Sequence, residues 1–173
     1  VNLWVIPTIT QTNDIIILYR LDNASIIEGA RLSKAPYVMF KHNDMTSLEQ
    51  KLEQAEDAEM KLIVVDGVFS MEGDLANLKG ITELAKQYNA VVMSDCAHAI
   101  GVIGEHGAGA ASHFDIEDQV DLIGGTFSKS LASIGGFTMH PYILWLSWLK
   151  TPVGSIRISS ILLLSKNTVS YTH

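Results

Sequence analysis

Four side chains with the means to act together in catalysis come from three separate parts of the chain. They are a hydroxyl, a carboxylate, an imidazole and an amine: Ser70, Asp95, His98 and Lys129. Carboxylates and imidazoles serve as acids, bases and charge partners. A lysine amine serves as a nucleophile when burial or nearby positive charge keeps it neutral near pH 7. These types together predict chemistry on a group that an amine can hold.

Two further hydroxyls accompany the lysine, because Thr126 and Ser128 stand in the segment GTFSKS at 125–130. Taken singly, each of these side chains has an ordinary structural explanation. An Asp at a strand end often forms a cap or turn, and Thr126 and Ser128 are also suited to capping a helix. A lone histidine usually packs in the protein, and a lone lysine is usually solvated. Only their convergence on one edge of a sheet favours a site.

Short apolar segments alternate along the chain with amphipathic ones. The apolar segments predict strands at 14–19, 37–40, 61–66, 90–95, 120–123 and 134–139. The amphipathic segments predict helices at 24–33, from Asp44 onward and at 76–88. This alternation predicts an α/β fold of three layers, with helices on both faces of a mainly parallel sheet. Ligands of such sheets bind at the carboxyl ends of the strands, where the reactive side chains fall.

Composition excludes several classes of protein. Of the 173 residues, 47% are hydrophobic and 18% charged, which indicates a globular chain. A net charge of −7 argues against nucleic-acid binding. Cys96 is the single cysteine, so no intramolecular disulfide forms, as is usual in a reducing compartment. Residues 1–10 do not resemble a secretion signal, and glycines and a proline interrupt the uncharged stretch 130–149, so we expect no transmembrane segment and a cytoplasmic location.

Other chemistries fit the sequence poorly. His98, His106 and His113 are spaced by eight and seven residues, which suits no common metal site, so no metal ion is expected. The chain has no Gly-x-Ser-x-Gly turn of the kind that carries a hydrolase nucleophile. The glycines at 101–109 do not open a helix directly after a strand, as a dinucleotide-binding motif requires.

Five motifs together resemble those of the α-oxoamine synthases, which are pyridoxal-phosphate enzymes of the aspartate-aminotransferase fold. The motifs are LDNASII at 21–27, HND at 42–44, DGVFSMEGD at 66–74, DCAH at 95–98 and GTFSKS at 125–130. The resemblance runs in register from about Asp14 to Phe137. It implies condensation of an amino acid with an acyl-CoA, release of carbon dioxide and a homodimeric enzyme.

The resemblance also implies roles for these residues toward pyridoxal 5'-phosphate. Lys129 would form a Schiff base with the cofactor aldehyde, and Asp95 would keep the pyridine nitrogen protonated. His98 would lie beside the phenolic oxygen with Ser70 and assist proton transfer. The remaining implied contacts are ring packing and phosphate binding: Ala97 on one face of the ring, and Thr126 and Ser128 at the phosphate.

Three positions depart from the family pattern. Asn23 replaces the histidine that usually stacks on the open face of the cofactor, so an amide takes its place in the cofactor site. Tyr19 stands where an acidic residue is common. Trp4 stands where glycine is usual, and a clash is expected there.

Within the family, the segment TFSKSLASIGGF at 126–137 is most similar to the serine palmitoyltransferase branch. The 2-amino-3-ketobutyrate CoA ligase and 8-amino-7-oxononanoate synthase branches remain alternatives, as does a truncated relative without catalysis. Residues 1–137 are expected to be the central part of the cofactor-binding large domain. Residues 138–173 form a divergent segment with no separate domain assigned, and the chain is expected to be a piece of a longer protein.

Overall fold

A computed structural model describes residues 1–140, 143–149 and 156–163, with side chains described as far as residue 140. The helices are α1 (Asn2–Ile9), α2 (Ala24–Leu32), α3 (Met45–Gln54), α4 (Leu78–Gln87) and α5 (Ala110–His113). The strands are β1 (Ile15–Tyr19), β2 (Tyr37–Phe40), β3 (Lys61–Asp66), β4 (Val91–Asp95), β5 (Leu122–Thr126), β6 (Gly136–His140), β7 (Ile143–Leu149) and β8 (Ile156–Leu163).

All eight strands belong to one mixed sheet, in the order β2-β1-β3-β4-β5-β6-β7-β8. Strands β1 to β5 pair in parallel, whereas β6, β7 and β8 continue the sheet in antiparallel pairing. The predicted α/β fold is confirmed, but its sixth strand runs opposite to the first five. The loop between Thr126 and Gly136 is too short for the crossover that a parallel pair needs.

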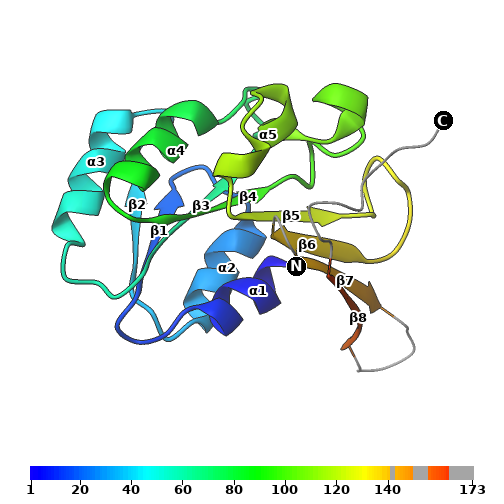
Figure 1. Cartoon of the computed structure of the whole chain (residues 1–173), viewed down its shortest axis with the longest axis horizontal. Coiled ribbons are helices and arrows are strands. Elements are labelled where there is room, and N and C mark those ends of the chain that lie inside the picture. Colours follow the sequence, from blue (N-terminus) through cyan, green and yellow to red (C-terminus); the bar gives the residue numbers. More distant parts are fainter. Residues whose placement is uncertain (141–142, 150–155, 164–173) are drawn as a thin grey trace.

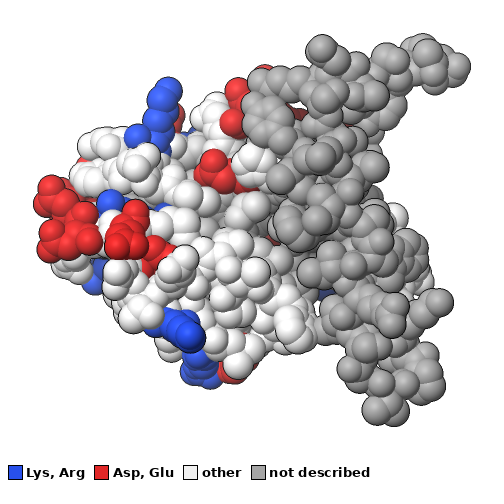
Figure 2. All heavy atoms as spheres, turned by 60° about the horizontal axis from the view of Figure 1, so that its bottom comes forward, with Lys and Arg blue, Asp and Glu red and all other residues white. Residues whose placement is uncertain are grey.

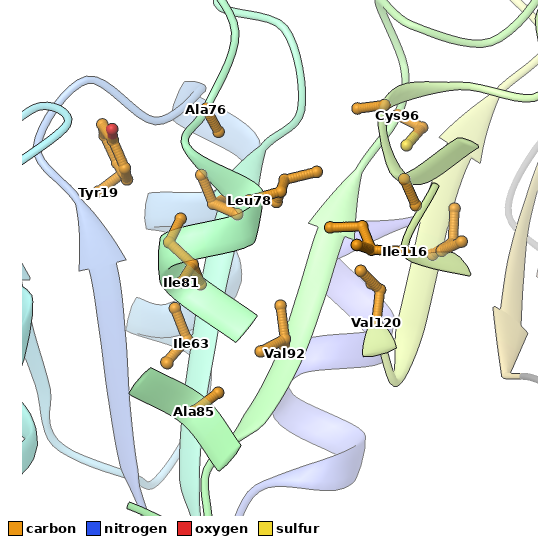
Figure 3. Close-up of a cluster of buried hydrophobic side chains, with 14 of the residues drawn as sticks. Tyr19, Ile63, Ala76, Leu78, Ile81, Ala85, Val92, Cys96, Ile116 and Val120 are labelled. Carbon is orange, nitrogen blue, oxygen red and sulfur yellow. The ribbon is translucent and has the colours of Figure 1, made fainter. Parts of the chain in front are cut away.

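Helices cover both faces of the parallel part of the sheet (Figure 1). Helices α1 and α2 lie on one face, where Ile6 and Ile26 pack against Ile16 and Leu18. Helices α3, α4 and α5 lie on the other face. There Leu78, Ile81 and Ala85 of α4 pack above strand residues such as Ile63 and Val92 (Figure 3). Alternate strand residues thus enter two separate cores, which explains why the strands are apolar throughout.

The direction of the chain across the sheet reverses between β1 and β3. After β1 the chain crosses to β2 on one side, and after β3 it crosses to β4 on the other. In open α/β sheets this reversal leaves a crevice at the carboxyl ends of the two strands, where ligands bind. Asp22, Asp66 and Asp95 follow or end β1, β3 and β4 at this edge.

Polar caps fix where the helices begin. The Asn23 side chain accepts the Ser25 N–H at the start of α2, Asp44 accepts the Ser47 N–H of α3, and Asn77 accepts the Gly80 N–H of α4. The predicted helix at 76–88 therefore begins two residues later than expected.

Surface charge is uneven. On the face shown in Figure 2, acidic side chains gather at the end of the molecule away from the residues drawn in grey. Within the described ranges, no helix is both long and apolar enough to cross a membrane. Strand β6 runs across the expected boundary at Phe137, and the assignment of 138–173 stays a prediction, because most of its side chains lie outside the described residues.

Candidate active site

Asp95 ends β4 with its carboxylate buried and held on both oxygens. Its Oδ1 accepts the backbone N–H of Ala97 at 2.8 Å, and its Oδ2 accepts the Asn2 side-chain amide at 2.5 Å. The same Asn2 amide donates to Ser25 Oγ at 2.9 Å, which joins α1, α2 and β4 at one point. The carboxylate is only 7% exposed. A buried carboxylate with two fixed donors is well suited to hold a positive charge brought to it.

Lys129 and His98 meet beside this carboxylate. Lys129 Nζ donates to His98 Nε2 at 2.5 Å, although the two residues come from different loops, after β5 and β4. Burial lowers the pKa of His98, the charge of Lys129 lowers it further, and Asp95 opposes both effects. The imidazole is therefore neutral near pH 7 and acts as the acceptor in this pair.

Thr126 and Ser128 bring two hydroxyls together just before Lys129. Their oxygens lie 2.9 Å apart, and the Ser128 backbone N–H donates to Thr126 Oγ1 at 3.3 Å. Thr126 Oγ1 also donates to the Gly135 carbonyl at 3.1 Å, which ties the two ends of the loop. Paired hydroxyls next to free loop surface suit a phosphate group.

Asn23 reaches the same edge from the start of α2. Its backbone N–H donates to Asp66 Oδ2 at 2.7 Å, and Asp66 lies in register beside Asp95 on the neighbouring strand. Ala97 is buried next to Asp95, where its N–H is already used.

Ser70 stands apart from these contacts. It is exposed in a tight hairpin in which the Phe69 N–H donates to the Asp74 carbonyl at 3.0 Å. Within the part of the chain that carries described side chains, the structure gives Ser70 no hydrogen bond to Lys129 or His98. Its predicted role beside the phenolic oxygen stays a prediction.

Two of the departures from the family pattern are accommodated. Tyr19 is fully buried, and its hydroxyl pairs with Asn43. Trp4 is 59% exposed on α1, so the expected clash does not occur within the described residues.

Sequence reasoning missed Asn2 and Asp66 as site residues. Asn2 is 93 positions from Asp95 in the chain, so neither its type nor its spacing signals the contact. Asp66 was visible as a polar residue that ends an apolar strand at the ligand-binding edge. That signal could have identified it.

The fold and the site together define a class of protein. Residues 2–157 match the family described as aminotransferase class I and II, and the chain belongs to this family. Because the match covers most of the chain, it includes every candidate residue described above.

Similar proteins place the chain more narrowly within that class. It is 56% identical over 137 residues to the serine palmitoyltransferase of Bacteroides ovatus, an alignment that covers 79% of this chain and 35% of that protein. It is 52% identical over 136 residues to the 8-amino-7-oxononanoate synthase of Thermosipho melanesiensis, with 79% and 35% covered. The resemblance to α-oxoamine synthases is thus confirmed.

Solved structures agree with this placement. The serine palmitoyltransferase of Sphingomonas wittichii superposes with a TM-score of 0.77 at 39% identity, covering 80% of this chain and 35% of that one. A high-resolution structure of SPT with PLP bound as an internal aldimine also gives a TM-score of 0.77, at 37% identity, with 80% and 35% covered. The chain therefore spans about a third of the length of the relatives it matches.

Proposed function

We propose that this chain is the central, cofactor-binding part of a pyridoxal-phosphate-dependent acyltransferase that condenses an amino acid with an acyl-CoA and releases carbon dioxide. The observation that carries the proposal is the Lys129–His98 pair at 2.5 Å beside the buried Asp95 carboxylate. The names of the relatives support the same chemistry.

The residues present fit pyridoxal phosphate by chemistry and position. Lys129 supplies an amine for the aldehyde, Asp95 supplies a negative charge for the ring nitrogen, and Thr126 and Ser128 supply hydroxyls for the phosphate. Asn2 adds a second indication, because its side-chain oxygen is buried and finds no hydrogen-bond partner among the described residues. When bound, the cofactor supplies an electron sink for the carbanion left by decarboxylation.

The chain's own residues fix the groups that bind the cofactor. Asn2 and the Ala97 N–H hold the Asp95 carboxylate in a fixed position, where it can pair with the ring nitrogen. The neutral His98 accepts a hydrogen bond from Lys129 Nζ and so holds the amine in a fixed position at the carboxyl edge of the sheet. Asn23, at the head of α2, offers hydrogen bonds in place of the aromatic stack that a histidine would give.

Serine is the amino acid that we propose, with a long-chain acyl-CoA as its partner, in sphingolipid synthesis. The serine palmitoyltransferase name of a 56% identical relative supports this choice. An oxononanoate synthase at 52% identity supports the alternative amino-acid and acyl-CoA pair almost as strongly, and a 2-amino-3-ketobutyrate CoA ligase remains the third option. A homodimer in the cytoplasm belongs to the same proposal and rests on the family resemblance.

A second candidate is a relative that binds no cofactor and has no activity. Asn23 in place of histidine favours this candidate. Cofactor binding separates the two candidates directly.

The test is a visible absorbance titration of the purified chain with pyridoxal phosphate, compared with Lys129→Ala. The proposal predicts a new absorbance band at a longer wavelength than that of free pyridoxal phosphate. This band is expected to be absent in Lys129→Ala. Lys79→Ala, which changes a lysine of α4 that makes none of the contacts of the candidate site, is the matched control and keeps the band. Serine and glycine are then added in turn, and serine is expected to shift the band at the lower concentration.

If wild type and Lys129→Ala both give only the spectrum of the free cofactor, the inactive relative is the correct assignment. If glycine shifts the band at lower concentration than serine, the choice of serine is wrong and the acyltransferase class stands.

A further inference from the structure

Three carboxylates lie buried at the carboxyl ends of three neighbouring strands. Asp22 follows β1, Asp66 ends β3 and Asp95 ends β4, and all three are less than a tenth exposed. Asp66 and Asp95 are register partners in the parallel pairing of β3 and β4. The proposed function uses only Asp95, so the other two need a separate explanation, because burying a carboxylate is costly.

Both of these carboxylates accept hydrogen bonds from backbone N–H groups. The donors to Asp22 lie at the ends of β1 and β3, and the donor to Asp66 lies at the start of α2. Asp22 Oδ2 accepts the Tyr19 N–H at 2.7 Å, and Asp22 Oδ1 accepts the Asp66 N–H at 3.0 Å. Asp66 Oδ2 accepts the Asn23 N–H at 2.7 Å. Asp66 is thus fixed by the loop after β1 and in turn fixes Asn23, at the point where the chain reverses direction across the sheet.

We propose that Asp66 is a positioning residue of the site: its carboxylate holds the backbone of Asn23 at the head of α2, and the charge of the neighbouring Asp95 sets how strongly it does so. This inference rests on the proposed function, because it concerns how the open face of the proposed cofactor site is built.

The groups around Asp66 determine whether its pKa is raised or lowered. Burial raises the pKa of Asp66 to about 7, the negative Asp95 contributes to the rise, and the Asn23 N–H and the positive Lys129 oppose it. Asp22, on the loop after β1, is a further titratable group that interacts with Asp66, and burial raises its pKa well above the ordinary value. Near neutral pH, Asp66 is therefore divided between its acid and its carboxylate.

Only the carboxylate makes a charge-assisted hydrogen bond to the Asn23 N–H, and such bonds are about twice as strong as neutral ones. A positive charge placed on Asp95 weakens the repulsion between Asp95 and Asp66, and so favours ionised Asp66. A cationic ligand at Asp95 would thereby tighten the contact that holds Asn23. The binding of the ring and the placement of the residue over its open face become linked.

The experiment follows the backbone amide of Asn23 by ¹⁵N NMR in the chain without any cofactor. From about pH 5 to about pH 9 the amide resonance is expected to move, with a midpoint at the raised pKa of Asp66, about 7. In Asp66→Asn the side chain still offers an oxygen acceptor but has no charge to lose, and the movement is expected to vanish. In Asp95→Asn the midpoint is expected to fall by about one pH unit or more.

Asp121→Asn is the matched control. Asp121 Oδ2 also accepts a strand N–H, that of Val92 at 2.8 Å, but at the opposite end of β4. This variant is expected to leave the Asn23 titration unchanged. Circular dichroism establishes that each variant is folded. If Asp66→Asn does not fold, the midpoint of the Asn23 titration in wild type is compared with that in Asp95→Asn alone.

An Asn23 amide that does not titrate in wild type, or a midpoint that Asp95→Asn leaves in place, overturns the inference. A titration that persists in Asp66→Asn also overturns it, because Asp22 would then be the group responsible. The absorbance titration with pyridoxal phosphate can fail separately: a chain that shows this titration but binds no cofactor keeps the link between Asp95, Asp66 and Asn23 and loses the proposed function.

Discussion

Asn2 connects the Asp95 carboxylate to the rest of the site. It is 3% exposed, and its amide nitrogen serves both Asp95 and Ser25. Hydrogen bonds to charged groups contribute more to stability than those between neutral groups. When the donor is removed, the buried carboxylate keeps the cost of its lost hydration without the bond that offset it. The Asp95 geometry therefore depends on a residue of another element.

Asn2→Ala is expected to lower the free energy of unfolding by about 2 kcal/mol and to weaken pyridoxal phosphate binding about tenfold. Urea unfolding and the absorbance titration measure the two effects. Asn13→Ala is the control: Asn13 donates to Glu59 at 3.0 Å on the surface, and its loss is expected to cost less than about 0.5 kcal/mol. Equal effects of the two substitutions would contradict the role of Asn2.

His98 provides a second test at the scale of single residues. Burial and the Lys129 charge lower its pKa, so the imidazole is expected to titrate below its ordinary value. Lys129→Ala removes one of the two lowering effects and is expected to raise the His98 pKa, as followed by proton NMR of the imidazole ring. Lys79→Ala is expected to leave it unchanged. A His98 pKa that is the same in wild type and Lys129→Ala would show that the two groups do not interact in solution.

Helices α1 and α2 form the element that presents Asn2 to Asp95. A side chain at Gly29 of α2 has no room: a Cβ there would lie 2.6 Å from the backbone oxygen of Asn2. Gly29 therefore sets the distance between the two helices. Because the obstacle is backbone, it moves only if α1 moves as a whole.

Gly29→Ala is expected to push α1 away and destabilise the chain by about 1 kcal/mol or more, despite the better helix propensity of alanine. Gly80→Ala in α4 is the matched control. The nearest atoms to a Cβ at Gly80 belong to the side chains of Asn77 and Met45, at 2.8 and 2.9 Å, and not to backbone, so a smaller loss of stability is expected even though Asn77 also caps α4. Urea unfolding of the two variants is expected to separate them, and Gly29→Ala as stable as Gly80→Ala would refute the close contact.

Most elements of the parallel sheet follow from local patterns in the sequence. The apolar runs predicted all five parallel strands to within a few residues, because strands buried on both faces are apolar throughout. Helix α1 was not predicted: it contains Pro7, and Val1 gives it no side-chain cap, so the usual signals are missing. The antiparallel direction of β6 depends on loop length, which the alternation of apolar segments does not report.

The candidate site divides in the same way. Lys129, His98 and Asp95 were predicted because their types follow strand ends, and the structure brings them together. The contact of Asn2 with Asp95 was not predictable, since it joins residues of a helix and a strand that are 93 positions apart in the chain. The interaction of Asp66 with Asp95 could be recognised only from the pairing of β3 with β4, which places the two residues side by side.

For the molecule as a whole, the buried carboxylates make stability depend on pH. Asp66 has a pKa of about 7 in the folded chain, against an ordinary value of 3.8. A carboxyl with a raised folded pKa stabilises the fold when protonated, so its contribution is complete below about pH 4 and is lost as the pH rises through about 7. Each unit of difference between the folded and unfolded pKa values changes the free energy of unfolding by at most about 1.4 kcal/mol.

The free energy of unfolding of wild type, minus that of Asp66→Asn, is therefore expected to fall as the pH rises across this window. Urea unfolding at a series of pH values measures it. Asp121→Asn corrects for the general effect of removing one carboxylate. A difference that stays constant with pH would mean that Asp66 has an ordinary pKa in the folded chain.

The chain spans about a third of its relatives' length, yet it contains the lysine, the carboxylate, the imidazole and the hydroxyls of the proposed site. A segment about a third as long as the relatives is thus proposed to provide the groups that bind the cofactor. The residues that select the amino acid and the acyl chain are not assigned within it.

The most direct test of the central claim is to locate the covalent attachment of pyridoxal phosphate. The chain is mixed with the cofactor, reduced with borohydride, digested and analysed by mass spectrometry, with Lys129→Ala and Lys79→Ala in parallel. In wild type and in Lys79→Ala, one dominant modified peptide is expected, and it contains Lys129. This peptide is expected to be absent in Lys129→Ala. Modification spread over surface lysines at similar yield in all three proteins would contradict it.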